Sequence, residues 1–440
     1  MSSAAMDKKR IAFLGIWSEV RYPFLGAMPR INGMVRTSGT RLVDALELSH
    51  EVDNRGNMIH GEAPARIFEF DRARSCFVSS RALIVEDHWS PEQIAEELNK
   101  RFDLVVFSAA NTIRPNFAPG AFADILRALR CDFVALGMGM QNALPDSIEG
   151  MHPNLLDLLD VCNKKALLFG VRGLETERWL KAVGYDHAVA LGCPSLFVYP
   201  QNILRMRAPE PQRVRRAVTA GYIHGRVDRS LALIKLFQGF EESHYVMQEE
   251  LVVLRHLGLL SDEQEIYNDA TAEVTRNVIE PVLEQIQRRQ LPFASYRWFQ
   301  DTSAWRAFVS QFDFFLGDRL HGGVVALQAG IPSIMMVDDL RVSEIADFFA
   351  IPKLSLQAAE DVPLREIVAT LLSESSLRNM QETYAERLSA FEAAFLKLNI
   401  PLAVGTGTLA PMTAVSAARR QLPPPSVSRR LKDWLAEAVR

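Results

Sequence analysis

Residues 312–337 read FDFFLGDRLHGGVVALQAGIPSIMMV and contain one complete strand–helix–strand pattern. An apolar run, Asp313–Leu316, is followed by a short polar segment, a helical stretch over Gly323–Ala329 and a second apolar run, Ser333–Val337. Two short buried strands joined by a helix are typical of a parallel sheet that is covered by helices.

The same alternation extends through most of the chain. In the first half, apolar runs predict strands at Ile11–Trp17, Ala82–Glu86, Asp103–Ser108, Phe133–Leu136, Ala166–Val171 and Ala188–Gly192. Apolar residues three or four apart predict helices at Pro91–Arg101, Phe117–Arg130, Pro153–Lys164 and Leu174–Val183. In the second half, the predicted strands are Ala217–Ile223, His244–Gln248 and Pro292–Tyr296, and the predicted helices are Arg229–Phe237 and Asp262–Arg289. His50–Ser80 fits neither pattern. The fold class is therefore α/β.

A change of composition divides the chain. The segment Pro200–Pro211 carries three prolines and two arginines and is typical of a linker. We expect an N-terminal Rossmann-like domain over residues 1–205 and a C-terminal one over 206–374. A long helix over 375–400 is expected to bridge the halves, and 401–440 to form a flexible tail with a terminal amphipathic helix. That last helix either docks on the globule or contacts a membrane surface.

The composition excludes several classes of protein. Hydrophobic residues make up 48% of the chain and charged residues 23%, which is ordinary globular usage. With 49 basic and 53 acidic residues the net charge is −4, so binding to nucleic acid is not expected. The four cysteines form no CxxC pair, and few cysteines in 440 residues suit a reducing cytosol. HExxH, EF-hand, GxSxG and Walker A motifs are absent from the sequence, so we expect no metal site and no cofactor.

The N-terminus superficially resembles a signal peptide, because Lys8–Arg10 precede the apolar run Ile11–Trp17. That run is at the short limit for a signal peptide and is followed by Glu19 and Arg21, so a buried first strand explains it better. No uninterrupted apolar stretch is long enough to predict a transmembrane helix. We therefore expect a cytoplasmic protein, with peripheral contact to the inner face of the membrane left open.

The polar segment before Gly323 carries the strongest functional signal. Arg319 and His321 follow the carboxyl end of a strand, where open α/β sheets bind ligands, and they precede a helix. A helix N-terminus and a guanidinium both favour an anion, and an imidazole moves protons near neutral pH. We predict an anion-binding reaction centre with Arg319 and His321 as catalytic residues. The competing interpretation pairs Arg319 with Asp313 or Asp318 and makes His321 a helix cap.

A second arginine occupies a similar position. In LLFGVRGLETERWL, residues 167–180, a predicted strand ends at Arg172 and a helix follows. Its position suits anion binding, but a salt bridge from Arg172 to Glu175 or Glu177 is an equal alternative. The next predicted strand leads into GCPSLF, residues 192–197, where Ser195 lies in a turn that a ligand can approach. Cys193 is a poor candidate nucleophile, because no base is marked nearby and buried cysteines are usually inert.

Other strand-end loops add weaker candidates. Gln141 lies in GMGMQN, residues 137–142, where glycines allow a ligand or backbone to come close. Asn111 follows the strand Asp103–Ser108, and Asp339 and Arg341 follow Ser333–Val337. These side chains suit sugar hydroxyls or the orientation of an arginine. Plain turn chemistry and an acidic helix N-terminus are the competing interpretations.

Several of these segments resemble one known family. GDRLHGGVVALQAGIP (317–332), followed by VDDLRVSEIADFF (337–349), resembles the C-terminal signature of the polysaccharide pyruvyl transferases. GMGMQ, GVRG and GCPSLF are similar to landmarks of the N-terminal half of that family, in the same order. The resemblance spans Ile11 to Pro352 in outline and is specific in these short segments, of which RLHG is the most distinctive.

The resemblance implies two Rossmann-like domains that face each other across a cleft, as in GT-B glycosyltransferases. It implies transfer of the enolpyruvyl unit of phosphoenolpyruvate onto a sugar of a surface-glycan or capsule precursor, with a pyruvate ketal as product. The expected partners are phosphoenolpyruvate and a sugar or lipid-linked oligosaccharide. In the family, the RLH tripeptide and an arginine of the other domain are implicated in holding phosphoenolpyruvate. The residues expected to bind substrate are Arg172, Leu320, Gly322, Gln141, Asn111, Ser195, Asp339 and Arg341.

Two other functions remain open from the sequence. A GT-B glycosyltransferase would use the same arginine and histidine to hold the diphosphate of a nucleotide sugar. A non-catalytic glycan-binding or scaffold protein would retain the fold without the chemistry.

Overall fold

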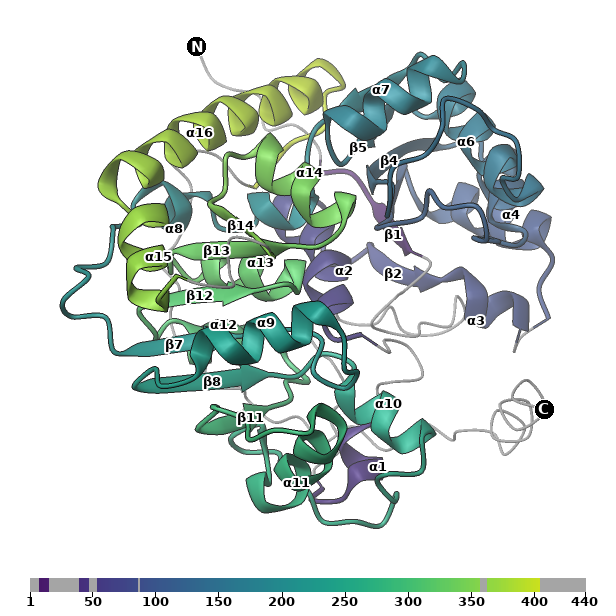
Figure 1. The fold of residues 1–440 in the computed structure, drawn as a ribbon. Helices are drawn as coiled ribbons and strands as arrows, with labels where there is room; N and C mark the ends of the chain where they lie inside the picture. Colours follow the sequence, from purple (N-terminus) through teal and green to yellow (C-terminus); the bar gives the residue numbers. More distant parts are fainter. Residues whose placement is uncertain (1–7, 16–38, 47–53, 86–87, 357–361, 404–440) are drawn as a thin grey trace.

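The computed structural model describes residues 8–15, 39–46, 54–85, 88–356 and 362–403. Two open sheets organise these residues, the first at the right and the second at the left of Figure 1. This confirms the predicted α/β class with two Rossmann-like halves. The predictions for the tail, including its terminal helix, lie outside the described residues, as does the end of the first predicted strand.

The first sheet is parallel throughout and has the strand order β2-β1-β3-β4-β5-β6. Its strands are β1 (Ile11–Gly15), β2 (Cys76–Ser79), β3 (Leu104–Ser108), β4 (Asp132–Met138), β5 (Leu168–Val171) and β6 (Ala188–Ala190). The helices of this half are α2 (Gly56–Ile67), α3 (Ser80–Val85), α4 (Pro91–Arg101), α5 (Phe122–Ala128), α6 (Pro153–Lys165) and α7 (Leu174–Ala182).

One predicted strand of this half was wrong. The run Ala82–Glu86 lies largely in helix α3, and the edge position in the sheet belongs to β2, within the stretch that fitted neither pattern. A short apolar run cannot by itself distinguish a buried strand from a buried helix. By contrast α4 begins where its capping box predicts, with Ser90 accepting a hydrogen bond from the backbone N–H of Gln93.

The second sheet has the order β14-β13-β12-β7-β8-β11-β10-β9. Its strand pairs are parallel except that β10 is antiparallel to both of its neighbours, β9 and β11. Its strands are β7 (Arg216–Thr219), β8 (Glu242–Val246), β9 (Tyr267–Asn268), β10 (Glu273–Val274), β11 (Ser295–Arg297), β12 (Phe314–Gly317), β13 (Ser333–Val337) and β14 (Lys353–Ser355). Its helices are α9 (Asp228–Phe237), α10 (Glu250–His256), α11 (Arg276–Gln287), α12 (Thr302–Val309), α13 (Leu320–Gln328), α14 (Leu340–Phe348) and α15 (Leu364–Leu371).

The long helix predicted over Asp262–Arg289 was also wrong in its first half. Strands β9 and β10 form a hairpin there, and only α11 is helical. The side chain of Asn268 accepts hydrogen bonds from the backbone N–H groups of Ala270 and Thr271, which closes a turn that a helix could not contain.

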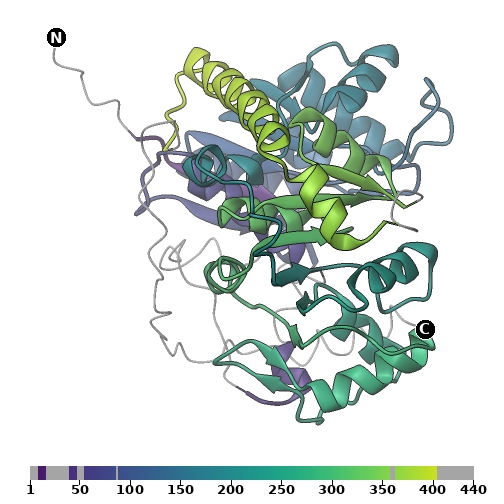
Figure 2. The same ribbon diagram turned by 60° about the vertical axis from the view of Figure 1, so that its left-hand side comes forward.

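Elements at the boundary of the two halves connect them. The predicted linker is partly helical, since α8 spans Pro200–Leu204, and a short 3-10 helix, η2, spans Pro194–Phe197. Helix α16 (Glu374–Lys397) crosses the top of Figure 1 and packs on α8. The ring of Phe391 stacks on Phe197 at 4.2 Å, and Phe395 meets Phe68 edge-on at 5.1 Å. The turned view in Figure 2 shows α16 as the long yellow-green helix at the top of the molecule.

Both faces of the first sheet are buried, and the faces belong to different cores. In β3, Leu104 and Val106 join a core that continues through η2 and α16 into the second half. Val105 and Phe107 point the other way, into a core that α4, α5, α6 and α7 cover. Side chains alternate across a strand, so one apolar run supplies both cores. The continuous core fixes the second half against the first.

The strand order defines where each sheet can bind a ligand. The chain adds β8 and β11 on one side of β7 and then returns to add β12 and β13 on the other. Ligands of open α/β sheets bind beyond the carboxyl ends of the strands at such a reversal. The loops after β7 and β12, which contain Gly221 and Arg319, lie at this point.

Candidate active site

Arg319 and His321 lie at the start of α13, directly beyond the end of β12. The helix begins at Leu320, with Arg319 as its N-cap and His321 inside its first turn. The sequence predicted that this helix begins at the glycine pair, but it begins about one turn earlier. Gly322 is closely packed, because a Cβ there would lie 3.0 Å from both Ala220 and Phe315. Leu320 is buried in the hydrophobic core at 3% exposure.

Arg319 is held by partners from other loops of the second sheet. Its Nη2 donates to Glu249 Oε1 at 2.5 Å, and its Nε donates to the backbone carbonyl of Gly221 at 3.0 Å. The guanidinium also lies over the ring of Tyr222, 5.2 Å from the centroid. Neither expected aspartate makes this ion pair, since Asp313 accepts from the backbone of Arg215 and Arg216 instead.

Carboxylates surround Arg319. Burial lowers the pKa of Arg319, but the charges of Glu249, Glu250 and Asp318 outweigh it and leave the pKa above its usual value. Glu250 is fully buried and accepts hydrogen bonds from Tyr245 and from the backbone N–H of Gln248. Arg319 is therefore permanently charged and surrounded by the carboxylates of Glu249, Glu250 and Asp318.

Arg172 has a different environment. It follows β5, its side chain is 1% exposed, and its Nε and Nη1 have no hydrogen-bond partner among the described residues. The alternative ion pairs are excluded, because Glu175 pairs with Arg178 and Glu177 pairs with Lys181. Buried N–H groups are almost always satisfied in proteins. Two unsatisfied guanidinium donors are a reason to expect a ligand there.

The glycines of GMGMQN make room for these side chains. A Cβ on Gly139 would lie 3.0 Å from both Cβ and Cδ of Arg172. A Cβ on Gly137 would lie 3.0 Å from Cε1 of His60 and 2.9 Å from the carbonyl oxygen of Ala109. Gly137 also has a φ of +72°, which favours glycine. These positions allow close approach of side chains as well as of a ligand.

His321 lies between the two halves of the molecule. Its ring centroid is 6.0 Å from that of His60 in α2, and its Nε2 is buried without a partner in the described part of the chain. Burial and then the neighbouring His60, Arg172 and Arg341 hold the pKa of His321 well below its usual value. Burial and Arg172 lower the pKa of His60 to about 3. Both imidazoles are neutral at pH 7, and a neutral imidazole accepts a proton or a metal rather than donating.

Cys193 and Ser195 lie on the other side of His60. Cys193 Sγ is 3.8 Å from His60 Nδ1 and 3.0 Å from Ser195 Oγ. Both residues are fully buried, so Ser195 contacts Cys193 rather than open space. His60 contacts Cys193 from 133 residues away along the chain, so no short stretch of sequence could show this neighbour.

The weaker candidates from the two halves meet around Gln141. Its side-chain oxygen accepts hydrogen bonds from Asn111 at 3.1 Å and Arg114 at 3.2 Å, and its backbone carbonyl accepts from the backbone N–H of Arg341. Asp339 is the N-cap of α14 and pairs with Arg341 Nη2 at 3.2 Å. This brings Asn111, Gln141 and Arg341 together, and the charge of Arg341 acts on both Arg172 and His321.

Glu344 of α14 lies close to the loop of Arg172. Its carboxylate accepts hydrogen bonds from the backbone N–H of Thr176 at 2.6 Å and from Thr176 Oγ1 at 2.9 Å. These contacts cap the N-terminus of α7, the helix that follows Arg172, and a carboxylate is favourable at that end of a helix. Glu344 thus ties the second half to the loop of Arg172.

His60 lies in the stretch that gave no clear pattern, because α2 is buried on most of its surface and has no single apolar stripe. Nine of its twelve residues are buried, including Glu62, which pairs with Arg306 and accepts from Thr302 Oγ1 at 2.9 Å. Figure 1 shows α2 between the two sheets. The sequence pattern around His60 therefore did not mark it as a site residue, and only the chemistry of histidine itself pointed to a function.

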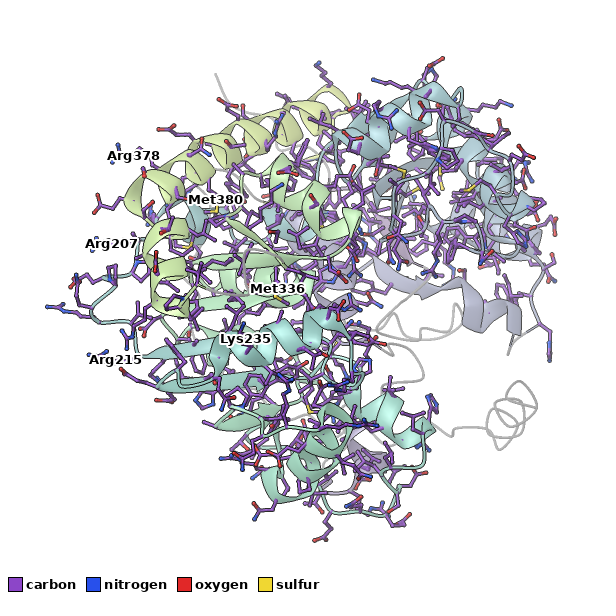
Figure 3. The ribbon with its side chains drawn as sticks, in the orientation of Figure 1. Arg207, Arg215, Lys235, Met336, Arg378 and Met380 are labelled. Atoms are coloured by element: carbon purple, nitrogen blue, oxygen red, sulfur yellow. The ribbon has the colours of Figure 1, made fainter. Side chains whose placement is uncertain are left out.

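A cavity of about 680 Å³ lies elsewhere. It is lined by the linker around Arg205–Glu210 and by Ala329–Pro332, at the amino ends of the second sheet's strands. In Figure 3, Arg207 of this lining lies at the left edge of the view, far from the central α2. The cavity is therefore separate from the cluster around His321.

We find no helix within the described ranges that combines the length and the apolar character of a membrane crossing.

Solved structures similar to this chain include Anabaena Alr3699/HepE in complex with UDP and glucose, with 12% sequence identity, coverage of 89% of this chain and 99% of that chain, and a TM-score of 0.41. Another is the UDP-GlcNAc 2-epimerase from Neisseria meningitidis bound to UDP-GlcNAc, with 9% sequence identity, coverage of 88% of this chain and 98% of that chain, and a TM-score of 0.43. A third is CalG4, the calicheamicin glycosyltransferase, with 15% sequence identity, coverage of 89% of this chain and 100% of that chain, and a TM-score of 0.35.

No curated protein matches the sequence significantly. The family model of polysaccharide pyruvyl transferase, however, matches residues 54–339, which is more than half of the 440 residues and includes Arg172, Arg319 and His321. The chain belongs to the polysaccharide pyruvyl transferase family and is a transferase.

Proposed function

We propose that this protein transfers the enolpyruvyl unit of phosphoenolpyruvate onto a sugar of a surface-glycan precursor in the cytoplasm, where it forms a pyruvate ketal. The observation that carries the proposal is the pair of buried, unsatisfied donors on Arg172 beside the neutral imidazole of His321. Family membership supports the same reaction.

Phosphoenolpyruvate suits this arrangement because it carries a carboxylate and a phosphate. Arg172 would bind one of these groups with Nε and Nη1, and Arg341, whose charge acts on His321, supplies further positive charge. Arg319 would contribute from the N-cap of α13, two residues before His321. Each charge-assisted hydrogen bond contributes about 1.5–3 kcal/mol. The same arginines would stabilise the phosphate as it leaves with its negative charge.

The proton balance defines the role of His321. Two sugar hydroxyls add to C2 of the enolpyruvyl unit, so two O–H bonds and the C2–O bond to phosphate break. One proton ends on the methylene carbon, which becomes a methyl group, and the other leaves with inorganic phosphate. His321 Nε2, neutral and unpaired within the described structure, would accept the hydroxyl proton. No electrons are transferred, so the reaction requires no redox cofactor.

The test is phosphate release from phosphoenolpyruvate in the presence of glycan-precursor acceptors. We expect Arg172→Ala, Arg319→Ala and His321→Ala to abolish release, whereas Arg205→Ala, at the separate cavity, should retain it. Full activity in the His321 and Arg319 variants would refute the assignment of this centre.

A ligand panel separates this function from nucleotide-sugar transfer. Phosphoenolpyruvate should raise the midpoint of thermal unfolding of the wild type and not of Arg172→Ala. Stabilisation by nucleotide sugars alone would reject the proposal, and tight glycan binding without any transfer would favour a non-catalytic role.

A further inference from the structure

Three side chains beside the proposed donor site have the chemistry of transition-metal ligands. His60 of α2, Cys193 before η2 and His321 of α13 each offer one ligand atom, and the three atoms lie within 4.8 Å of one another. No other group of three or more potential ligands from histidine, cysteine, aspartate and glutamate is found in the described ranges. We propose that His60, Cys193 and His321 bind a divalent transition-metal ion of the zinc type.

The neighbours of His60 already prepare it as a ligand. Its Nε2 lies 3.0 Å from Ser108 Oγ, and its Nδ1 faces Cys193 Sγ. If Nε2 carries the ring proton and donates it to Ser108, then Nδ1 is left with a free electron pair directed at the thiol. Metal-binding histidines characteristically use their second ring nitrogen in this way, which fixes both tautomer and ring orientation.

The ligand atoms of Cys193 and His321 lie within 4.8 Å of each other and of that of His60. His321 Nε2 is buried and has no hydrogen-bond partner among the residues that the structure covers, so no existing bond opposes coordination by it. Cys193 Sγ is 3.8 Å from His60 Nδ1. Tetrahedral zinc, with Zn–S of about 2.3 Å and Zn–N of about 2.0–2.1 Å, separates sulfur and nitrogen ligands by about 3.5 Å. A contraction of a few tenths of an ångström closes this pair.

The ligand types select the class of metal. Two imidazoles and one thiolate suit zinc and its neighbours, whereas calcium and magnesium require oxygen ligands. Three protein ligands leave a fourth position for water or substrate, as in catalytic rather than structural zinc sites.

The charges near the three ligands act in both directions on the binding of a divalent cation: an arginine opposes it, and a thiolate and two carboxylates favour it. Arg172 is close enough for its charge to act on His60 and His321. Cys193, which loses its proton on coordination, and the carboxylates of Asp339 and Glu344 act on Arg172 with the opposite sign.

One consequence rests on the proposed function. Coordination by His321 Nε2 would use the electron pair that otherwise accepts the hydroxyl proton, so the metal-bound and proton-accepting forms of His321 exclude each other. Added zinc should therefore slow phosphate release, and a chelator should restore it. Metal binding itself is measured without activity, so failure of the proposed reaction leaves the site testable.

The experiment is metal analysis of the full chain after dialysis against Zn²⁺ and then against metal-free buffer. We expect one zinc per chain in the wild type and its loss in Cys193→Ser. Cys162→Ser is the matched control, because Cys162 is equally buried, lies in α6 within the other core and is not part of the cluster. Ser108→Ala should bind zinc about 10–100-fold more weakly, as removal of a hydrogen bond behind a histidine ligand does.

Cobalt substitution of the wild type gives a readout that does not depend on variant folding. Tetrahedral Co²⁺ with one thiolate should show a sulfur-to-cobalt charge-transfer band and intense visible bands, retained in Cys162→Ser. A wild type that retains no zinc, a cobalt spectrum without the thiolate band, or equal zinc content in folded Cys193→Ser would overturn the proposal.

Discussion

Arg172 and Arg319 each lie in a loop just beyond the end of a strand, one in each sheet. The two arginines differ in their hydrogen-bond partners. Arg319 is paired with Glu249 and hydrogen-bonded to the backbone of Gly221. Arg172 is more deeply buried, and two of its nitrogens have no partner in the described structure. A paired arginine is held in place by the protein, whereas an unpaired buried one remains available to an anion. We therefore propose that Arg319 positions charge and that Arg172 binds the anion.

The largest expected effect comes from truncating each arginine to methionine. Arg319→Met removes the arginine that pairs with Glu249 and whose charge acts on the buried Glu250, and it leaves His224 as the basic group beside both carboxylates. This should lower the free energy of unfolding by about 3–5 kcal/mol. Arg172→Met breaks no ion pair and should cost about 1 kcal/mol or less. Urea unfolding of the two folded variants measures the difference, and equal losses would contradict the comparison.

Activity should not follow stability in this pair. Loss of about two charge-assisted bonds from Arg172 should lower kcat/KM by about 10²–10⁴-fold, even though its variant is the more stable. Phosphate release measured at a temperature where both variants are folded checks this. A stable and fully active Arg172→Met would remove the anion-binding role.

The next effect concerns Asp318, which lies beside Arg319. It is buried, its carboxylate oxygens make no hydrogen bond within the described residues, and its nearest cation is Arg229 Nε at 3.4 Å. Burial raises the pKa of Asp318 to about 6, although Arg319 and Arg229 oppose the rise. Because the folded protein holds this proton more tightly than the unfolded chain, stability should fall as pH rises from about 4 to 6 and then level off.

The expected loss across that window is on the order of 2–3 kcal/mol. Asp318→Asn should remove this part of the pH dependence, as measured by urea unfolding at pH 4 and pH 7. A variant with the same slope as the wild type would assign the dependence to other groups.

A smaller effect is expected from releasing Arg319 without removing it. Glu249→Gln keeps the side-chain shape but takes away the charge that holds Nη2, so kcat/KM should fall about ten-fold, mostly through KM. The matched control is Glu241→Gln, which breaks the exposed pairs with Arg215 and Arg365. If both variants lose the same activity, the effect does not arise at Arg319.

The smallest effect tests the space around Arg172. Gly139→Ala would press on Arg172 Cβ and Cδ, and we expect it to cost about 1 kcal/mol of stability and to raise KM by about five-fold. In Gly170→Ala, the nearest atoms to the added Cβ belong to Leu136 and Leu191, at 3.1 Å, and to the carbonyl of Ala135, at 3.4 Å. This variant should cost similar stability without the change in KM. Identical KM values in the two variants would show that the position of Arg172 does not matter.

The sequence predictions were accurate where a short stretch of sequence carries a distinctive pattern, and inaccurate where it does not. The strand Ser333–Val337 and the helix Pro91–Arg101 were predicted with their observed bounds. Helix α3 was mistaken for a strand, since its short apolar run has no distinctive period. Helix α2 was missed, because burial on most of its surface removes the amphipathic pattern.

The candidate site shows the same division. Local patterns were sufficient to place Arg172 and Arg319 at strand ends and His321 at a helix start, because strand ends and glycine-rich turns are visible within a few residues. The partner of Arg319 is 70 residues away along the chain, and His60 is 133 residues from Cys193. Such distant pairs are brought together only when two sheets and α2 pack on one continuous core, so no short stretch of sequence encodes which side chains remain unpaired.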